Sequence, residues 1–428
     1  MLIEFSVGNY LSFKEKVTFS MVASKVVAQY KELDENNIIR VDNELNLLKS
    51  AAVYGANASG KSNLVKAIGF MQWFVLNSSK ETQITDSINV ENFKLSTETA
   101  DQPSCFEIVF LENKRIYRYG FEVNQERVLS EWLFHVPNVR ESQLFKRVED
   151  EVKIKQIFKE GDGIISKTRK NALFISVVAQ FNGAISQKIL LFFARKLNVI
   201  SGLHSDMYRS FTIEYFKKNR FNIIKLIQKF DLGIDDINIT TRRVLPEDLS
   251  EIPEEFRKLI LSSDTLQSHN IQTFHKKYDS EGEATSSLEQ FNLDKNESEG
   301  TKKLFAFAGP ILETLRKGEV IIIDELDARL HPLITRTIID LFNSNETNIN
   351  NAQLIFMTHD TNLLSDKIFR RDQIWFTEKD RKGSTDLYSL VEYKVESDTS
   401  FESDYIKGRY GAIPFIGDLS QVIKAEDD

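Results

Sequence analysis

The spacing of apolar and polar residues predicts a strand-rich first third of the chain. The opening segments LIEFSVGNYLSF and KVTFSMVA alternate apolar and polar positions, which predicts two short strands joined near Gly8 and Asn9. Residues 104–147 again contain short β-type runs that Asn, Glu and Gly interrupt. We therefore expect a β-rich flank around this part of the chain.

Three short runs are apolar almost throughout, as is typical of the inner strands of a parallel sheet. They are SAAVYGA, which starts at residue 50, EVIIID, which ends at residue 324, and QLIFMTH, which ends at residue 359. The first run leads into a glycine turn and then a helical pattern that continues to about Leu76. Further helices are predicted over 301–318 and 332–342. This order of elements indicates an α/β fold.

The middle of the chain has a different pattern. Between about residues 150 and 290, apolar residues follow helical spacing, as in ISQKILLFFARKL and RSFTIEYFKKNRFNIIKLIQKF. The polar segment HKKYDSEGEATSSLEQFNLDKNESEG, residues 275–300, is predicted to be a loop. No heptad pattern or internal repeat is visible, so long coiled-coil arms are not expected.

The glycine turn after the first apolar run matches the phosphate-binding pattern G-x-x-x-x-G-K-[ST], with a strand before it and a helix after it. Its residues are Gly55, Ala56, Asn57, Ala58, Ser59, Gly60, Lys61 and Ser62, and Asn63 follows. In such a P-loop the backbone N–H groups point at nucleotide phosphates. Lys61 would contact the β and γ phosphates, and the Ser62 hydroxyl would bind Mg²⁺.

The run VIIIDELD, residues 320–327, ends in two adjacent carboxylates. Acids at the carboxyl end of a buried strand lie where α/β sheets bind ligands. Asp324 is therefore a candidate to hold Mg²⁺ through water, and Glu325 a candidate to polarise the attacking water. Strand-end acids are also common as solvated caps, but the upstream P-loop favours the catalytic interpretation.

The two motifs are far apart, because the P-loop ends at residue 62 and the acidic strand begins at residue 320. An insertion must separate the two halves of the site. This arrangement resembles the ABC-type ATPases of the SMC, RecF and OLD group more than ordinary AAA+ motors.

The resemblance implies further site residues. Ser298 and Gly300 stand where the group places a signature sequence that grips the γ phosphate bound by the other subunit, although the form here departs from LSGGQ; a plain helix N-cap is the alternative. His359 resembles the switch histidine of the group. Residues 328–332 resemble the D-loop, where two subunits touch, and Gln102 is a candidate Q-loop ligand of Mg²⁺.

Across nearly its whole length the chain resembles the AAA-type ATP-binding proteins of the RloA-like and abortive-infection family. The segments that carry this resemblance are FSVGNYLSF, the P-loop, TRKNALFISV, SEGTKKLF, DELDARLHP, RRDQIWFTEKD and GRYGAIPFIGDL. The resemblance implies an ABC-type P-loop ATPase core with a β-rich flank and an inserted helical lobe. We expect 1–147 to form the first half of the core, 148–290 the lobe and 291–428 the second half.

The same resemblance implies a Mg²⁺-dependent ATPase that forms at least a dimer on ATP and works beside a separately encoded nuclease in defence against phage. The residues after His359 contain no acidic cluster of the kind that an OLD-type nuclease domain needs. The lack of an N-K-x-D motif favours ATP over GTP. A RecF-like or SMC-like ATPase that clamps DNA, and a scaffold that binds ATP without hydrolysis, are the alternatives.

Composition limits the partners and the compartment. The net charge of −8 gives no overall basic field for nucleic acid or anionic membranes, so DNA or RNA contact would need a local patch. Basic clusters at 167–170 and 217–220 are more typical of solvated helix faces. A single cysteine, Cys105, fits a reducing compartment, and no apolar run approaches a membrane span. We expect a cytoplasmic protein without a membrane partner.

Overall fold

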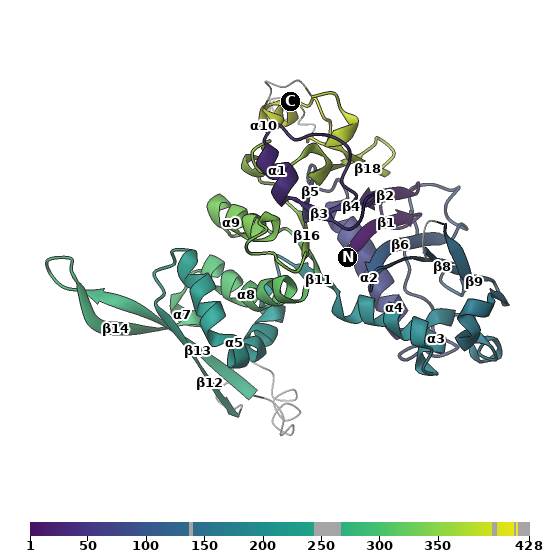
Figure 1. Cartoon of the computed structure of the whole chain (residues 1–428), viewed down its shortest axis with the longest axis horizontal. Helices are drawn as coiled ribbons and strands as arrows, with labels where there is room; N and C mark the ends of the chain where they lie inside the picture. The colour runs from purple at the N-terminus through teal and green to yellow at the C-terminus, as the bar shows by residue number, and fades with distance from the viewer. Residues whose placement is uncertain (137–139, 244–266, 396–399, 415–416, 418–428) are drawn as a thin grey trace, which may run out of the picture. The chain divides into compact units, whose positions relative to one another are not determined.

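The computed structural model describes residues 1–136, 140–243, 267–395, 400–414 and 417 (Figure 1). The contacts divide the chain into two compact units. The first unit comprises Met1–Leu203 and Thr314–Asp428, and the second comprises His204–Glu313. The chain therefore leaves the first unit once and returns to it, as expected for a core with an insertion.

A six-stranded sheet forms the centre of the first unit. Its order is β11 (Leu197–Ser201), β15 (Val320–Asp324), β16 (Gln353–Met357), β5 (Ser50–Tyr54), β17 (Ile374–Lys379) and β18 (Thr385–Ser389). The first five strands are parallel, and only β18 runs antiparallel to its neighbour. The carboxyl ends of the five parallel strands therefore meet at one edge of the sheet.

The strands of this sheet are apolar because both of their faces are covered. Every residue of β5 and of β16 is buried. Helix α2 (Lys61–Asn77) contacts β11 and β15, and helix α9 (Pro332–Asn343) contacts β5 and β16. These elements match the strands and helices predicted from the apolar runs.

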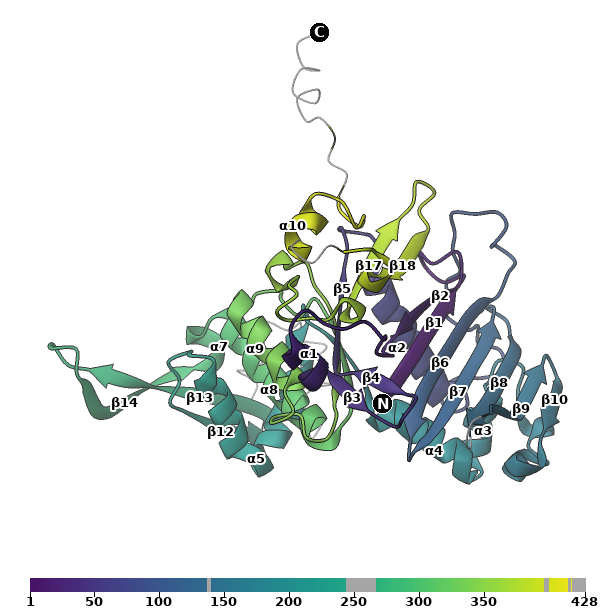
Figure 2. The ribbon, with the colours of Figure 1, turned by 45° about the horizontal axis from the view of Figure 1, so that its top comes forward.

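A seven-stranded antiparallel sheet flanks the core (Figure 2). Its order is β10 (Glu151–Ile154), β9 (Ser142–Val148), β8 (Val128–Val136), β7 (Arg115–Val123), β6 (Ser104–Glu112), β1 (Leu2–Gly8) and β2 (Val17–Ser20). Buried Glu131 on β8 accepts hydrogen bonds from the backbone N–H groups of Phe174 at 2.6 Å and Ile175 at 3.0 Å. This carboxylate fixes the start of helix α3 (Phe174–Gln180) to the flank.

The smaller elements of the first unit are α1 (Lys31–Asn36), the hairpin of β3 (Ile38–Arg40) and β4 (Asn46–Leu48), α4 (Ala184–Arg195) and α10 (Phe401–Ile406). The fold class expected from the sequence is confirmed: an α/β core with a parallel sheet, a β-rich flank and an inserted lobe.

The second unit contains more strand than expected. Helices α5 (Arg209–Lys229), α7 (Leu293–Asn296) and most of α8 (Glu299–Lys317) belong to it. A three-stranded antiparallel sheet of β12 (Asp236–Arg243), β13 (Gln267–Tyr278) and β14 (Ala284–Asn292) accompanies them. The prediction of a loop over 275–300 is wrong, because this segment forms the β13–β14 hairpin and α7. Strand β14 is exposed along most of its length, so it has no buried face that an apolar pattern could reveal.

The boundaries of the insertion differ from the expected 148–290. Residues 148–203 belong to the first unit, and the second unit extends to residue 313. The helical spacing of α3 and α4 suggested that they belong to the lobe. Their apolar side chains Phe174, Ile189 and Phe192 instead lie in the main hydrophobic core, and β11 joins the central sheet.

Among the described residues, no single helix has the length and hydropathy of a membrane span. Helices α3 and α4 meet that test only as a pair, and the pair is bent by 107°.

Candidate functional site

The P-loop connects β5 to α2 at the edge of the sheet where the parallel strands end. Gly55 has φ 153°, Ala58 has φ 62°, and Gly60, the N-cap of α2, has φ 122°. These φ values lie in the left-handed region that favours glycine, so the chain turns sharply between β5 and α2. Asn57 and Ala58 are exposed at the tip. A glycine turn between a strand and a helix is the structural context that a phosphate-binding loop needs.

The ammonium group of Lys61 folds back onto its own loop. It donates hydrogen bonds to the carbonyl oxygens of Gly55 at 2.7 Å and Ala56 at 3.0 Å. Burial lowers the pKa of Lys61 to about 8, although Asp324, Glu325 and Asp327 act in the opposite direction. Two hydrogen bonds thus hold the ammonium group of Lys61 at the loop, although burial disfavours its charged form.

The acidic pair lies at the end of β15. Asp324 is the last residue of the strand, and Glu325, which follows it, has φ 53°. A non-glycine residue in this region of φ is strained, and such strain is common at functional sites. Among the described residues, Asp324 Oδ1 and Asp327 Oδ1 are buried without a hydrogen-bond partner. These oxygens can accept a ligand that the polypeptide does not supply.

His359 lies between the P-loop and the acidic pair. Strand β16, which ends two residues before it, lies between β15 and β5, and the Thr358 N–H donates to the carbonyl oxygen of Val53 at 3.2 Å. Burial and the charge of Lys61 lower the pKa of His359, and the three acids Asp324, Glu325 and Asp327 oppose this shift. The shift favours the neutral imidazole, whose ring N–H can donate a hydrogen bond to an anion.

One cavity of about 390 Å³ joins these groups. It is lined by Asn57, Ala58, Ser59, Gly60, Lys61, Ser62, Asn63, Glu325, His359 and Lys379. The lining residues come from the turns that follow β5, β15 and β16, from the first turn of α2 and from the end of β17. The structure therefore brings together the P-loop, the carboxylate and the histidine that the sequence nominates.

The residues present fit a Mg²⁺ ion held largely by non-protein ligands. Among the described residues, no group of three or more His, Cys, Asp or Glu could hold a metal ion. Mg²⁺ keeps several waters and uses one or two carboxylates together with substrate phosphates. The unpartnered oxygen of Asp324 and the hydroxyl of Ser62 suit such a site.

Gln102 is not brought to this site. It precedes β6 of the flanking sheet, where its backbone carbonyl accepts a hydrogen bond from the Asn9 side chain at 2.7 Å. It lines a separate cavity of about 450 Å³ whose described lining contains no P-loop residue. The sequence suggested a Q-loop because Gln102 precedes a strand. It did not show that this strand, β6, joins the flanking sheet and not the central sheet. We do not retain Gln102 as a metal ligand.

Ser298 and Gly300 belong to the second unit, at the start of α8. The Ser298 hydroxyl accepts a hydrogen bond from the Thr301 backbone N–H at 3.1 Å and lies 2.9 Å from the Thr301 hydroxyl. This geometry is that of a helix N-cap. This cap stabilises the first turn of α8, in which Gly300 is half-buried.

Two site residues were missed from the sequence, Lys379 and Asp327. Lys379 ends β17 and lines the phosphate cavity because β17 is the parallel neighbour of β5. Asp327 acts on Lys61 and His359 by its charge. Asp327 could have been found as the third acid of VIIIDELD, whereas Lys379 depends on the strand order.

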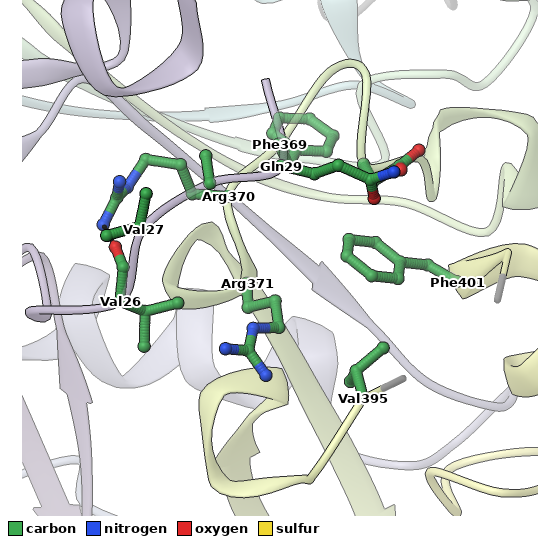
Figure 3. A pocket seen from close by; sticks show the side chains of 10 residues that line it. Val26, Val27, Gln29, Phe369, Arg370, Arg371, Val395 and Phe401 are labelled. Carbon is green, nitrogen blue, oxygen red and sulfur yellow. Dashed lines mark hydrogen bonds between the residues drawn. The ribbon is translucent and has the colours of Figure 1, made fainter. Parts of the chain in front are cut away.

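Another cavity of the first unit, of about 320 Å³, is shown in Figure 3. Val26, Val27, Phe369, Arg370, Arg371 and Phe401 are among its lining residues. Arg370 forms ion pairs with Asp34 and Asp372, so its charge is already compensated inside the protein. None of the described lining residues belongs to the phosphate cavity.

Residues 50–365, well over half of the chain, match the family described as "AAA domain, putative AbiEii toxin, Type IV TA system". No curated protein matches the sequence.

Solved structures with a similar fold include the SMC head domain from Thermotoga maritima, with a TM-score of 0.41 and 14% identity over 92% of this chain and 99% of that chain. Another is the Smc head domain with an extended coiled coil, bound to the C-terminal domain of ScpA and derived from Pyrococcus furiosus. Its TM-score is 0.38, with 14% identity over 96% of this chain and 98% of that chain.

The lowered pKa of Lys61 predicts how nucleotide affinity depends on pH. Phosphates favour the charged ammonium, so binding raises its pKa above the value of about 8 in the free protein. Affinity should be constant below that pH and should weaken above it, by up to about tenfold per pH unit, because binding must then take up a proton. Calorimetric titration between about pH 7 and pH 9.5 measures this dependence.

Lys61→Arg is the matched control, because a guanidinium stays charged over this range. If Lys61→Arg binds, its affinity should not change with pH. A wild-type affinity that is equally independent of pH would contradict the lowered pKa of Lys61.

Proposed function

The chain belongs to the AAA-domain family described for AbiEii toxins of type IV toxin–antitoxin systems, and on that premise we propose that it binds ATP with Mg²⁺ and hydrolyses it. The family match confirms the resemblance to AAA-type ATPases predicted from the sequence. One observation carries the proposal: Lys61, Glu325 and His359, which are distant in the sequence, line the same cavity at the edge of the parallel sheet.

Each group has a role in this proposal. The P-loop N–H groups and Lys61 bind the β and γ phosphates. Ser62 and Asp324 hold Mg²⁺, which neutralises charge on the phosphates when it is bound. Glu325 lies at the cavity wall and orients the water that attacks the γ phosphate. The ring N–H of His359 donates a hydrogen bond to the γ phosphate. Because ADP lacks this phosphate, the bond distinguishes ATP from ADP.

We propose further that a second copy of the chain completes the site. The described residues that line the phosphate cavity all belong to the first unit. The ordered N-terminus of α8, with Ser298 and Gly300, is a helix end of the kind that binds anions. In the proposed assembly this helix end of one copy contacts the γ phosphate held by the P-loop of the other, so that ATP links two subunits.

Glu325→Gln tests hydrolysis and assembly together. The amide keeps the size of the side chain but cannot act as a base, so hydrolysis should fall by about a hundredfold or more. ATP with Mg²⁺ should therefore hold the variant in an assembly of at least two copies, whereas wild type should return to its starting mass as ATP is consumed. Light scattering with and without ATP measures the mass of each protein, and release of phosphate measures hydrolysis.

Glu346→Gln is the matched control, since Glu346 lies in an exposed turn outside the cavity. It should behave like wild type. A mass that ATP leaves unchanged in both wild type and Glu325→Gln, with hydrolysis continuing in the monomer, would remove the shared-site proposal and leave only the P-loop assignment.

The biological role we propose is ATP-dependent control of a separately encoded effector, a nuclease, in defence against phage. The family description names a toxin–antitoxin system, which supports a role in arresting growth. Cells that carry the complete locus should restrict phage plating, and Lys61→Ala should abolish the restriction by preventing ATP binding. Equal plating efficiency on wild-type and Lys61→Ala cells would contradict the proposal.

The alternative of a DNA-clamping ATPase gains no support from the basic clusters. Lys217 forms an ion pair with Glu214, and Arg220 forms an ion pair with Asp236. Lys167 lies over the Phe181 ring. These three cations already interact with groups of the protein itself, which is typical of solvated helix faces.

A further inference from the structure

Hydrogen bonds connect the P-loop to the hairpin of β17 and β18, which lies more than 300 residues later in the sequence. Ser59 Oγ and Thr377 Oγ1 are 2.6 Å apart, and Thr377 also donates to the carbonyl oxygen of Tyr54 at 3.3 Å. Thr385 Oγ1 donates to the carbonyl oxygen of Ser59 at 2.8 Å. Ser59, Thr377 and Thr385 are almost completely buried, so water cannot replace these bonds.

The two glycines of the P-loop touch the same threonines. A Cβ atom on Gly55 would come within 2.6 Å of Thr377 Oγ1, and a Cβ atom on Gly60 would come within 2.5 Å of the Thr385 side chain. No side chain fits at such distances. The glycines therefore allow the loop to approach the hairpin as well as to adopt positive φ.

The hydroxyl groups of Ser12 and Thr385 can each donate one hydrogen bond and accept another, in a chain that runs from Asn63 to Ser59. The Asn63 side-chain N–H donates to Ser12 Oγ at 2.8 Å, and Ser12 Oγ is 2.8 Å from Thr385 Oγ1. A carbonyl can only accept, so the single proton of Thr385 goes to Ser59, and the Ser12 hydroxyl can then donate to Thr385. Ser12, from the N-terminal segment, and Thr385 thus hold the second half of the loop, at Ser59 and Asn63.

We propose that Thr377 and Thr385 are positioning residues for the phosphate-binding loop, so that the β17–β18 hairpin sets the affinity of the site for nucleotide phosphates. This inference rests on the proposed ATP site. Neither threonine lines the cavity that contains Lys61. Thr377 lines a neighbouring cavity of about 650 Å³ that shares Asn57, Ala58 and Ser59 with it, and Thr385 lines neither cavity. Through their hydroxyl groups the two threonines hold Ser59 of the loop in place.

The physical reason is preorganisation. A loop that is already ordered loses little conformational entropy when the phosphates bind, whereas a loosened loop must be ordered at that moment. Removal of one hydroxyl also leaves a buried partner on the loop without its hydrogen bond. Both effects weaken nucleotide binding without removing any group that contacts the reacting atoms.

Thr377→Val and Thr385→Val test the proposal, since valine keeps the shape of threonine and removes the hydroxyl. Each variant should raise the dissociation constant for ATP and for ADP by about tenfold, and the rate at saturating ATP should change by less than about twofold. Thr377→Ser and Thr385→Ser should restore the affinity, because serine keeps the hydroxyl. Thermal unfolding without nucleotide shows whether each variant is folded.

Thr335→Val is the matched control. Thr335 is also fully buried in the first unit, and its hydroxyl has no hydrogen-bond partner among the described residues. The control should bind ATP as wild type does. A folded Thr377→Val or Thr385→Val that binds ATP as tightly as wild type would overturn the positioning role, whereas wild type that binds no nucleotide would overturn the proposed function itself.

Ser59→Ala covers the case in which a valine variant does not fold. It removes the Ser59–Thr377 bond from the side of the loop, so it should raise the dissociation constant by about the same factor as Thr377→Val. Where both single variants fold, the double variant Ser59→Ala/Thr377→Val should bind no more weakly than Thr377→Val alone, because both substitutions remove the same Ser59–Thr377 bond. A Ser59→Ala variant with wild-type affinity, or fully additive losses in the double variant, would contradict the proposal.

Discussion

The parallel order of β15, β16, β5 and β17 is the constraint on which the candidate site depends. Because these strands run in the same direction, the residues that follow them emerge at one edge of the sheet. The P-loop, Glu325, His359 and Lys379 come from widely separated parts of the sequence, yet all line one cavity there. Hydrophobic burial of the strands holds this edge, so the polar groups need no ligand to be brought together.

Hydrogen bonds within the protein order the phosphate site. Phosphates would replace the bonds of Lys61 and would leave those of the hairpin threonines in place. Lys61 binds two carbonyl groups of its own loop, and the hairpin threonines hold Ser59. In contrast, buried oxygens of Asp324 and Asp327 lack partners among the described residues. The Lys61 ammonium group therefore has hydrogen-bond acceptors within the protein, whereas these two carboxylate oxygens can bind an external cation. In our proposal, ATP takes over the bonds of Lys61 and Mg²⁺ binds Asp324.

The sequence predicted the parts of the fold that carry a strong local pattern. The buried runs that became β5, β15 and β16 are apolar along most of their length, and the P-loop has a sequence pattern of its own. The exposed strand β14 has no such pattern, and the helical spacing of α4 did not indicate which unit would bury it. Lys379, Thr377 and Thr385 could not be assigned to the site, because their proximity to the P-loop depends on strand pairing that no local pattern encodes.

The central claim is that the P-loop forms a phosphate site whose charge is supplied by Lys61. Calorimetric titration of ATP with Mg²⁺ into wild type and Lys61→Ala is the most direct test. Wild type should bind ATP at one site per chain, and Lys61→Ala should lose that binding while its unfolding temperature without nucleotide stays close to that of wild type. Equal affinity of the two proteins would contradict the claim.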